Sequence, residues 1–186
     1  MGLFLQNVIL LDCDEKTAKA ALKKAEQISD SSMLELVPEE CQFQQFPKGV
    51  SILLNDHCCG YDALAQLLSE TTMKPVMLLY IYDDDFWGYC FYDKGEVLDV
   101  FTPLPDYFET ASEKDRRESS GNSSIIASYF DIEEDSIKNY LVSWEDLIME
   151  DDFEARAYAD DECGQCDCWQ MVDFMRRLGF PYEWDN

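Results

Sequence analysis

The chain has 186 residues, a length typical of one domain that buries its own hydrophobic core. Hydrophobic residues make up 47% of the sequence and aromatic residues 13%, which excludes an intrinsically disordered chain. The 39 Asp and Glu outnumber the 14 Lys and Arg, giving a formal net charge of -25. We therefore expect neither nucleic-acid binding nor docking on anionic membranes, because both need a basic surface.

The start of the sequence bears on the cellular compartment. Residues 1–12 are mostly apolar, but they lack the positive charge that precedes the apolar region of a signal peptide. No stretch approaches the roughly 18–20 apolar residues that cross a bilayer. We expect a soluble, cytoplasmic protein in which most of the eight cysteines are reduced thiols.

The first part of the sequence predicts a strand, a helix and several short strands. Residues 3–12 are apolar and rich in strand-forming side chains, and Asp14 is placed to cap a helix over 15–29. Short strands are expected further on, separated by proline and glycine turns, over 33–37, 41–46 and 50–54.

The middle of the sequence predicts a second helix and three further strands. The helix is expected over 60–71, and the almost continuously apolar residues 75–82 indicate a central strand. Strands over 86–92 and 96–101 should form a hairpin. We therefore predict an α+β protein with a mainly antiparallel sheet. Its sheet domain would cover 1–108 and consist of two strand–helix–strand halves, 1–48 and 49–108.

The remaining sequence predicts an acidic helical segment. Residues 109–123 are polar and lack periodicity, which indicates a mobile loop. We expect residues 124–186 to pack on the sheet domain through short helices over 124–130, 133–142, 144–149 and 169–178. Gly179 is a typical residue at the end of a helix.

The negative charge is concentrated in the second part of the chain. Residues 83–186 contain 28 acidic and 8 basic residues, a net charge of -20. Such a surface could simply keep the protein in solution, or it could attract and select a basic protein partner. Under the second interpretation, the candidate partner-binding acids are Asp151, Asp152, Asp160 and Asp161.

A second candidate interaction site combines acidic and aromatic residues. Asp83, Asp84 and Asp85 precede Trp87 and Tyr89, and aromatic residues dominate the centres of many protein interfaces. The alternative for the aromatic residues is the core of the hairpin. The alternatives for the three acids are a solvated turn and a site for Mg²⁺ or Ca²⁺.

A cysteine cluster supplies the candidate metal site. Cys163 and Cys166 have the Cys-x-x-Cys spacing that holds zinc, and Cys168 could be a third ligand. A fourth ligand is not evident, since His57 is the only histidine. Zinc is thus the alternative to a protein without cofactor. A further alternative is an enzyme with a carboxylate-based site, although the sequence has no nucleophile elbow, phosphate loop or dinucleotide-binding motif.

Two stretches carry a resemblance to known proteins. One is Asp-Asp-Asp-Phe-Trp-Gly-Tyr at 83–89 with Gly95, Asp99 and 105–108; the other is 167–174 with Leu178-Gly179. They resemble a family of bacterial proteins that has no assigned biochemical activity. In size and acidity the chain is also similar to immunity proteins, which neutralise bacterial toxins. The resemblance implies a non-enzymatic protein that inhibits a basic toxin such as a nuclease, and it carries over no functional residues.

Overall fold

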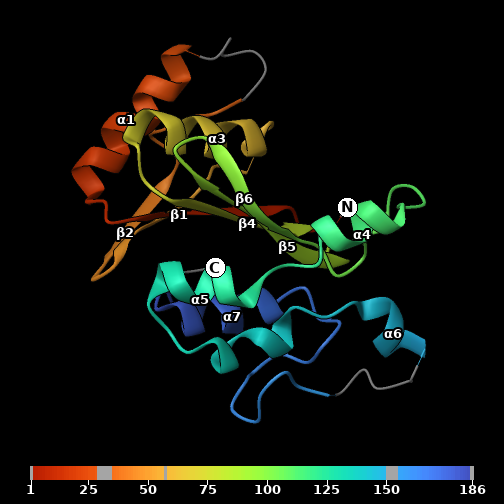
Figure 1. Cartoon of the computed structure of the whole chain (residues 1–186). Coiled ribbons are helices and arrows are strands. Elements are labelled where there is room, and N and C mark those ends of the chain that lie inside the picture. Colours follow the sequence, from red (N-terminus) through yellow and green to blue (C-terminus); the bar gives the residue numbers. More distant parts are fainter. Residues whose placement is uncertain (1, 29–34, 57, 150–154, 185–186) are drawn as a thin grey trace. The chain divides into compact units, whose positions relative to one another are not determined.

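The computed structural model describes residues 2–28, 35–56, 58–149 and 155–184 (Figure 1). Six strands form one antiparallel sheet in the order β2-β3-β1-β4-β5-β6. The strands are β1 (Leu5–Leu11), β2 (Gln42–Phe46), β3 (Gly49–Leu53), β4 (Val76–Tyr82), β5 (Phe86–Asp93) and β6 (Glu96–Phe101). The α+β class and the antiparallel sheet are confirmed, and each strand lies within two residues of the range expected for it.

The chain divides into two compact units. The N-terminal unit consists of Phe4–Tyr80 and Cys90–Leu98, and the C-terminal unit consists of Met1–Leu3, Ile81–Tyr89 and Asp99–Asn186. Strands β4, β5 and β6 contribute residues to both units. The internal similarity of 1–48 and 49–108 stays a prediction, as does the packing of 124–186 on a sheet domain.

In the N-terminal unit, helices α1 (Glu15–Ile28) and α3 (Tyr61–Thr72) cover one face of the strands (Figure 1). The expected cap of α1 is present, since Asp14 Oδ1 accepts a hydrogen bond from the Thr17 amide at 2.7 Å. Small and branched apolar residues of α1 share one hydrophobic core with alternate residues of β1 such as Val8 and Leu10, which are completely buried.

The strand expected over 33–37 is not formed by its described residues, 35–37. The side chain of Asn55 replaces a neighbouring strand there: it accepts a hydrogen bond from the Val37 amide and donates one to the Glu35 carbonyl, both at 3.0 Å. These bonds satisfy backbone groups without a strand partner. The rest of that expected strand lies outside the described residues.

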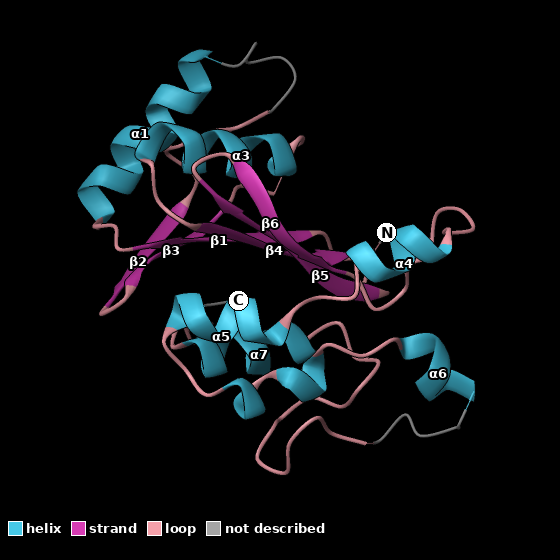
Figure 2. Ribbon diagram, in the orientation of Figure 1, coloured by secondary structure: helices cyan, strands magenta, loops and turns pink. Residues whose placement is uncertain are grey.

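The C-terminal unit contains short helices joined by turns (Figure 2). They are α4 (Glu113–Glu118), α5 (Ser123–Phe130), α6 (Trp144–Met149), α7 (Gln170–Leu178) and the 3-10 turns η1 (Glu134–Ser136) and η2 (Lys138–Tyr140). Gly179 ends α7 with a left-handed φ of 86°, as expected. The helix expected over 133–142 is replaced by the two 3-10 turns.

The expectation of a loop over 109–123 is wrong for α4. Ser112 and Asp115 form a reciprocal capping box, in which each side chain accepts a hydrogen bond from the other residue's amide. Beyond the helix, the Gly121 amide donates to the Val100 carbonyl at 3.0 Å. The segment lacks an apolar periodicity because no α4 residue is buried.

Candidate docking surface

Three consecutive acids form the tight turn between β4 and β5. Asp83 and Asp84 have left-handed φ values of 52° and 62°, and the Asp85 amide donates to the Tyr82 carbonyl at 2.9 Å. Two left-handed residues match the twist of a hairpin, and Asp tolerates this conformation better than most residues. All three side chains are exposed, because the turn projects beyond the ends of its strands.

The start of the chain holds this turn in place. The Gly2 amide donates to Asp83 Oδ1 at 3.0 Å, and the Asp84 amide donates to the Leu3 carbonyl at 3.2 Å. A Cβ atom on Gly2 would collide with both the side chain and the backbone of Asp83. Only glycine therefore permits this close approach.

Aromatic side chains lie beside the acidic turn. Tyr107 Oη donates a hydrogen bond to Asp85, which raises the pKa of the phenol to about 12. The Tyr107 ring centroid lies 4.9 Å from that of Phe86 and 4.9 Å from that of Phe108. Phe108 contacts Tyr82 edge to face at 5.0 Å, yet 69% of Phe108 is exposed. We call the exposed residues Asp83, Asp84, Asp85, Tyr107 and Phe108 the acidic aromatic surface.

The three acids of this surface lie apart from the ion pairs of the described residues. Within the described ranges, no Lys or Arg forms an ion pair with Asp83, Asp84 or Asp85. Asp106, which precedes Tyr107, differs because it pairs with Arg116, which also contacts Glu145 at 2.9 Å. Negative charge and exposed aromatic carbon therefore occur together at one place in the C-terminal unit.

The other two residues predicted for this site, Trp87 and Tyr89, are completely buried. The expectation that they contact a partner is wrong, because Phe174 of α7 covers the face of β5 that they share. Trp87 Nε1 donates to Gln170 Oε1 at 3.1 Å, and the Tyr89 ring stacks on Phe174 at 5.8 Å. Tyr89 Oη also donates to Asp99 at 2.6 Å, so the polar atoms of both rings have partners within the chain.

The acidic C-terminal block is only partly available for binding. Asp160 is exposed and pairs with Arg177. Asp161 is buried, so predicting it as a partner contact is wrong: it accepts hydrogen bonds from Tyr140 Oη at 2.6 Å and from the Tyr158 amide at 2.9 Å. The other two predicted acids, Asp151 and Asp152, lie outside the described residues.

Sequence reasoning missed a second buried acid, Asp173 of α7. Its carboxylate accepts hydrogen bonds from the amides of Glu162 and Cys163 at 3.0 and 2.8 Å, and from Arg176 at 2.7 Å. Asp173 thereby attaches the preceding loop to the last helix. The sequence does contain a signal for the ion pair: Asp173 and Arg176 stand three residues apart in a predicted helix, a spacing at which opposite charges are neighbours.

The cysteine cluster contains three thiols that form no disulfide. Burial raises the pKa of Cys163 and of Cys168 to about 11, and it also raises that of Cys166, so all three are protonated at neutral pH. Within the described part of the chain, no group of three or more His, Cys, Asp or Glu residues could hold a metal ion. The zinc alternative gains no support from this arrangement, and His57 lies outside the described residues.

Comparison with protein families, curated proteins and solved structures finds no match to this chain. Among the described helices, none combines the length and the apolar character that spanning a membrane requires.

Proposed function

We propose that this is a non-enzymatic protein-binding module that docks a basic partner protein on the acidic aromatic surface. The most specific version of this proposal is an immunity-type inhibitor that binds a basic toxin in the cytoplasm and blocks its activity. The observation that carries the proposal is the exposure of three carboxylates beside Tyr107 and Phe108, with which no Lys or Arg of the described residues forms an ion pair.

The chemistry of the surface supports a protein partner. Exposed aromatic rings lose unfavourable contact with water when a partner covers them, which favours association. Carboxylates around such rings attract Lys and Arg side chains and repel acidic proteins. With a net charge of -25 the whole chain adds long-range attraction for a basic partner, and salt should weaken this attraction.

The fixed shape of the turn also supports the proposal. The Gly2 amide donates to the Asp83 side chain, the Leu3 carbonyl accepts from the Asp84 amide, and Tyr107 donates to Asp85. A surface that is ordered before binding loses less conformational entropy on association. The turn can therefore present its charges without first having to become ordered.

The test begins with the immobilised protein and a lysate of its own source cells, at about 50 mM and about 500 mM salt. A partner captured at low salt is identified and purified, and its association rate is measured with wild type and with the D83N/D84N/D85N variant. Asn tolerates the left-handed turn and keeps an acceptor oxygen for Gly2 and Tyr107. The variant therefore removes charge without removing the acceptors that hold the turn.

The matched control is E40Q/E70Q/E96Q, which neutralises three exposed acids of the N-terminal unit. We expect association at least about tenfold slower with the aspartate variant than with the control. Phe108→Ala should in turn accelerate dissociation. Equal association rates for the aspartate variant and the control would refute docking at the turn, as would a captured partner that is itself acidic.

A further inference from the structure

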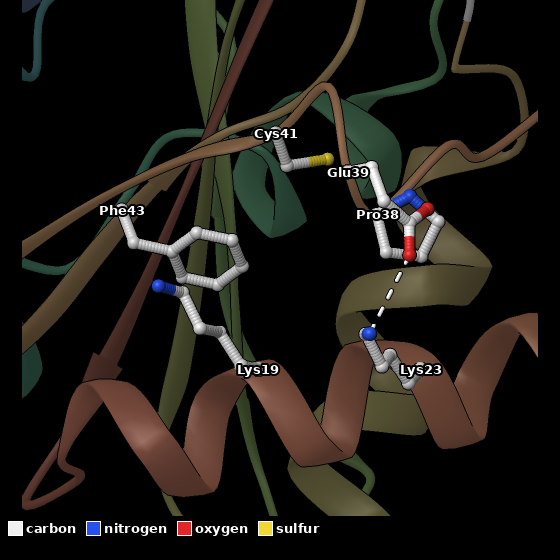
Figure 3. Close-up of a pocket in the computed structure, with 6 residues that line it drawn as sticks. All are labelled: Lys19, Lys23, Pro38, Glu39, Cys41 and Phe43. Carbon is white, nitrogen blue, oxygen red and sulfur yellow. Dashed lines mark ion pairs between the residues drawn. The ribbon is translucent and has the colours of Figure 1, made fainter.

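A pocket of about 340 Å³ opens in the N-terminal unit between α1 and the segment that leads into β2 (Figure 3). Its described lining residues are Lys19, Lys23, Pro38, Glu39, Cys41 and Phe43. The volume lies within the range of about 300–1,000 Å³ that is typical of sites for small molecules. The pocket contains none of the residues of the acidic aromatic surface and therefore calls for a separate explanation.

Two ammonium groups border the pocket. Lys19 and Lys23 stand one turn apart on α1, so they lie on the same face of the helix. Lys19 Nζ lies 5.0 Å from the centre of the Phe43 ring, and Lys23 Nζ lies 3.4 Å from Glu39 Oε1. Figure 3 shows Lys19 with Phe43 on one side, Lys23 with Glu39 and Pro38 on the other, and Cys41 between them.

Lys19 and Lys23 each form an exposed ion pair in which another anion could replace the acidic side chain. Lys19 pairs with Glu15 on the same helix, and the Lys23–Glu39 pair has side-chain exposures of 60% and 67%. Ion pairs in contact with water contribute little to stability. An anionic ligand can therefore replace Glu39 as the partner of Lys23 without loss of a strong interaction.

The rest of the lining is uncharged. Pro38 is buried and Phe43 is half-buried, so the pocket has two apolar ring surfaces. The buried Cys41 contributes a neutral thiol, because burial raises its pKa and its Sγ donates to the Val37 carbonyl at 3.5 Å. A flat apolar group in this space would lie between rings while its charged end faces the lysines.

The local charge favours an anion here, in contrast to most of the chain. Helix α1 carries Lys16, Lys19, Lys23 and Lys24 but only Glu15 and Glu26 as acids. In a protein of net charge -25, nonspecific attraction of anions is weak, so an anion must be held by local contacts. This helix supplies such contacts.

We propose that the pocket binds a small aromatic carboxylate. The carboxylate lies between the ammonium groups of Lys19 and Lys23, and the ring lies against Phe43 and Pro38. The proposal is independent of partner docking, because the two sites share no residue.

The test measures binding of 2-naphthoate to the full-length protein by calorimetry and by ¹H–¹⁵N NMR. Two matched probes separate the contribution of the carboxylate to binding from that of the rings. 2-Naphthalenemethanol has the same rings without charge, and acetate has the charge without rings. We expect saturable binding of 2-naphthoate, with NMR shifts confined to α1 and the residues around Phe43. Both control probes should bind at least about tenfold more weakly. Absence of 2-naphthoate binding, or equal binding of either control probe, would overturn the proposal.

Substitutions of the lining residues test the location of the site, because some should weaken the binding of 2-naphthoate and one should strengthen it. K19Q and K23Q should each weaken 2-naphthoate binding about fivefold, whereas K24Q, one residue away and outside the described lining, should leave it unchanged. E39Q should tighten binding about threefold, because it removes the acid that competes for Lys23. Thermal unfolding of each variant shows whether it is folded. Equal effects of K23Q and K24Q, or weaker binding by E39Q, would contradict the site.

Discussion

Asp161 and Arg177 form an ion pair of 3.0 Å in which the Asp161 side chain is completely buried. Tyr140 and the Tyr158 amide complete the shell of donors around the carboxylate. The neighbouring Asp160 also pairs with Arg177, but its side chain is 71% exposed. Two adjacent acids of one loop therefore bind the same arginine of α7 in different environments: Asp161 is buried, and Asp160 remains at the surface.

The first prediction compares these two acids. Asp161→Asn keeps the size of the side chain but removes its charge, leaving Arg177 and Tyr140 without their buried anionic acceptor. We expect a loss of about 3 kcal/mol in the free energy of unfolding, measured with urea. Asp160→Asn is the control and should cost less than about 1 kcal/mol. Similar losses in both variants would show that burial of Asp161 does not govern its contribution.

The second prediction concerns pH. Burial raises the pKa of Asp99 in the folded protein, although hydrogen bonds from Tyr89 and Asn122 oppose the shift. The folded state then binds this proton more tightly than the unfolded state, so Asp99 makes the protein less stable as pH rises from the unfolded pKa, about 3.9, through the folded one. Below the unfolded pKa this penalty is absent.

Urea unfolding at several pH values, with wild type and Asp99→Asn, checks this sign. Asn retains an acceptor for Tyr89 and does not titrate. The stability of wild type relative to the variant should therefore fall as pH increases through that interval. A relative stability that rises with pH would mean that the hydrogen bonds to the Asp99 carboxylate outweigh its desolvation.

The third prediction compares two glycines. Gly179 has a φ of 86° and open space where a Cβ would lie, so Gly179→Ala should cost only backbone strain, about 1 kcal/mol. At Gly49 a Cβ would collide with the Leu10 carbonyl, and Gly49→Ala should cost about 3 kcal/mol or more, because the pairing of β1 with β3 must shift. Chemical unfolding measures both losses. A larger loss at position 179 would contradict this order.

Local signals in the sequence predicted much of the fold. Asp14 and Gly179 mark helix ends that form as expected, because capping depends on residues only a few positions apart. Successive side chains of a strand point to opposite faces of the sheet, so the sequence also placed Trp87 and Tyr89 on one face of β5. It did not show that Phe174 covers this face, because that contact joins residues more than 80 positions apart.

The candidate site was harder to predict for the same reason. Nothing local distinguishes Asp160 from Asp161, since their environments depend on Tyr140 and Arg177, which come from other parts of the chain. The exposed turn at Asp83 was predictable as a charged turn. Its association with the Phe108 ring depends on where the chain runs after β6.

The last prediction ranks the cysteines by reactivity. Cys59 is exposed, whereas its neighbour Cys58 is buried and has a pKa raised to about 12 by desolvation. Because the thiolate is the reactive form, brief alkylation of the native protein should modify Cys59 well before Cys58. Peptide mass spectrometry distinguishes the two sites, and alkylation of the unfolded protein provides the control in which both react.

The same experiment examines the cysteine cluster. Cys163 and Cys166 are partly exposed, so they should react more slowly than Cys59 but faster than the buried Cys168. Zinc protects thiolates that ligate it. Burial raises the pKa of all three thiols, so metal binding would have to displace tightly held protons, and added zinc should leave these rates unchanged. Protection of Cys163, Cys166 and Cys168 together by stoichiometric zinc would instead establish a metal site, with further ligands supplied by a rearrangement of the loop.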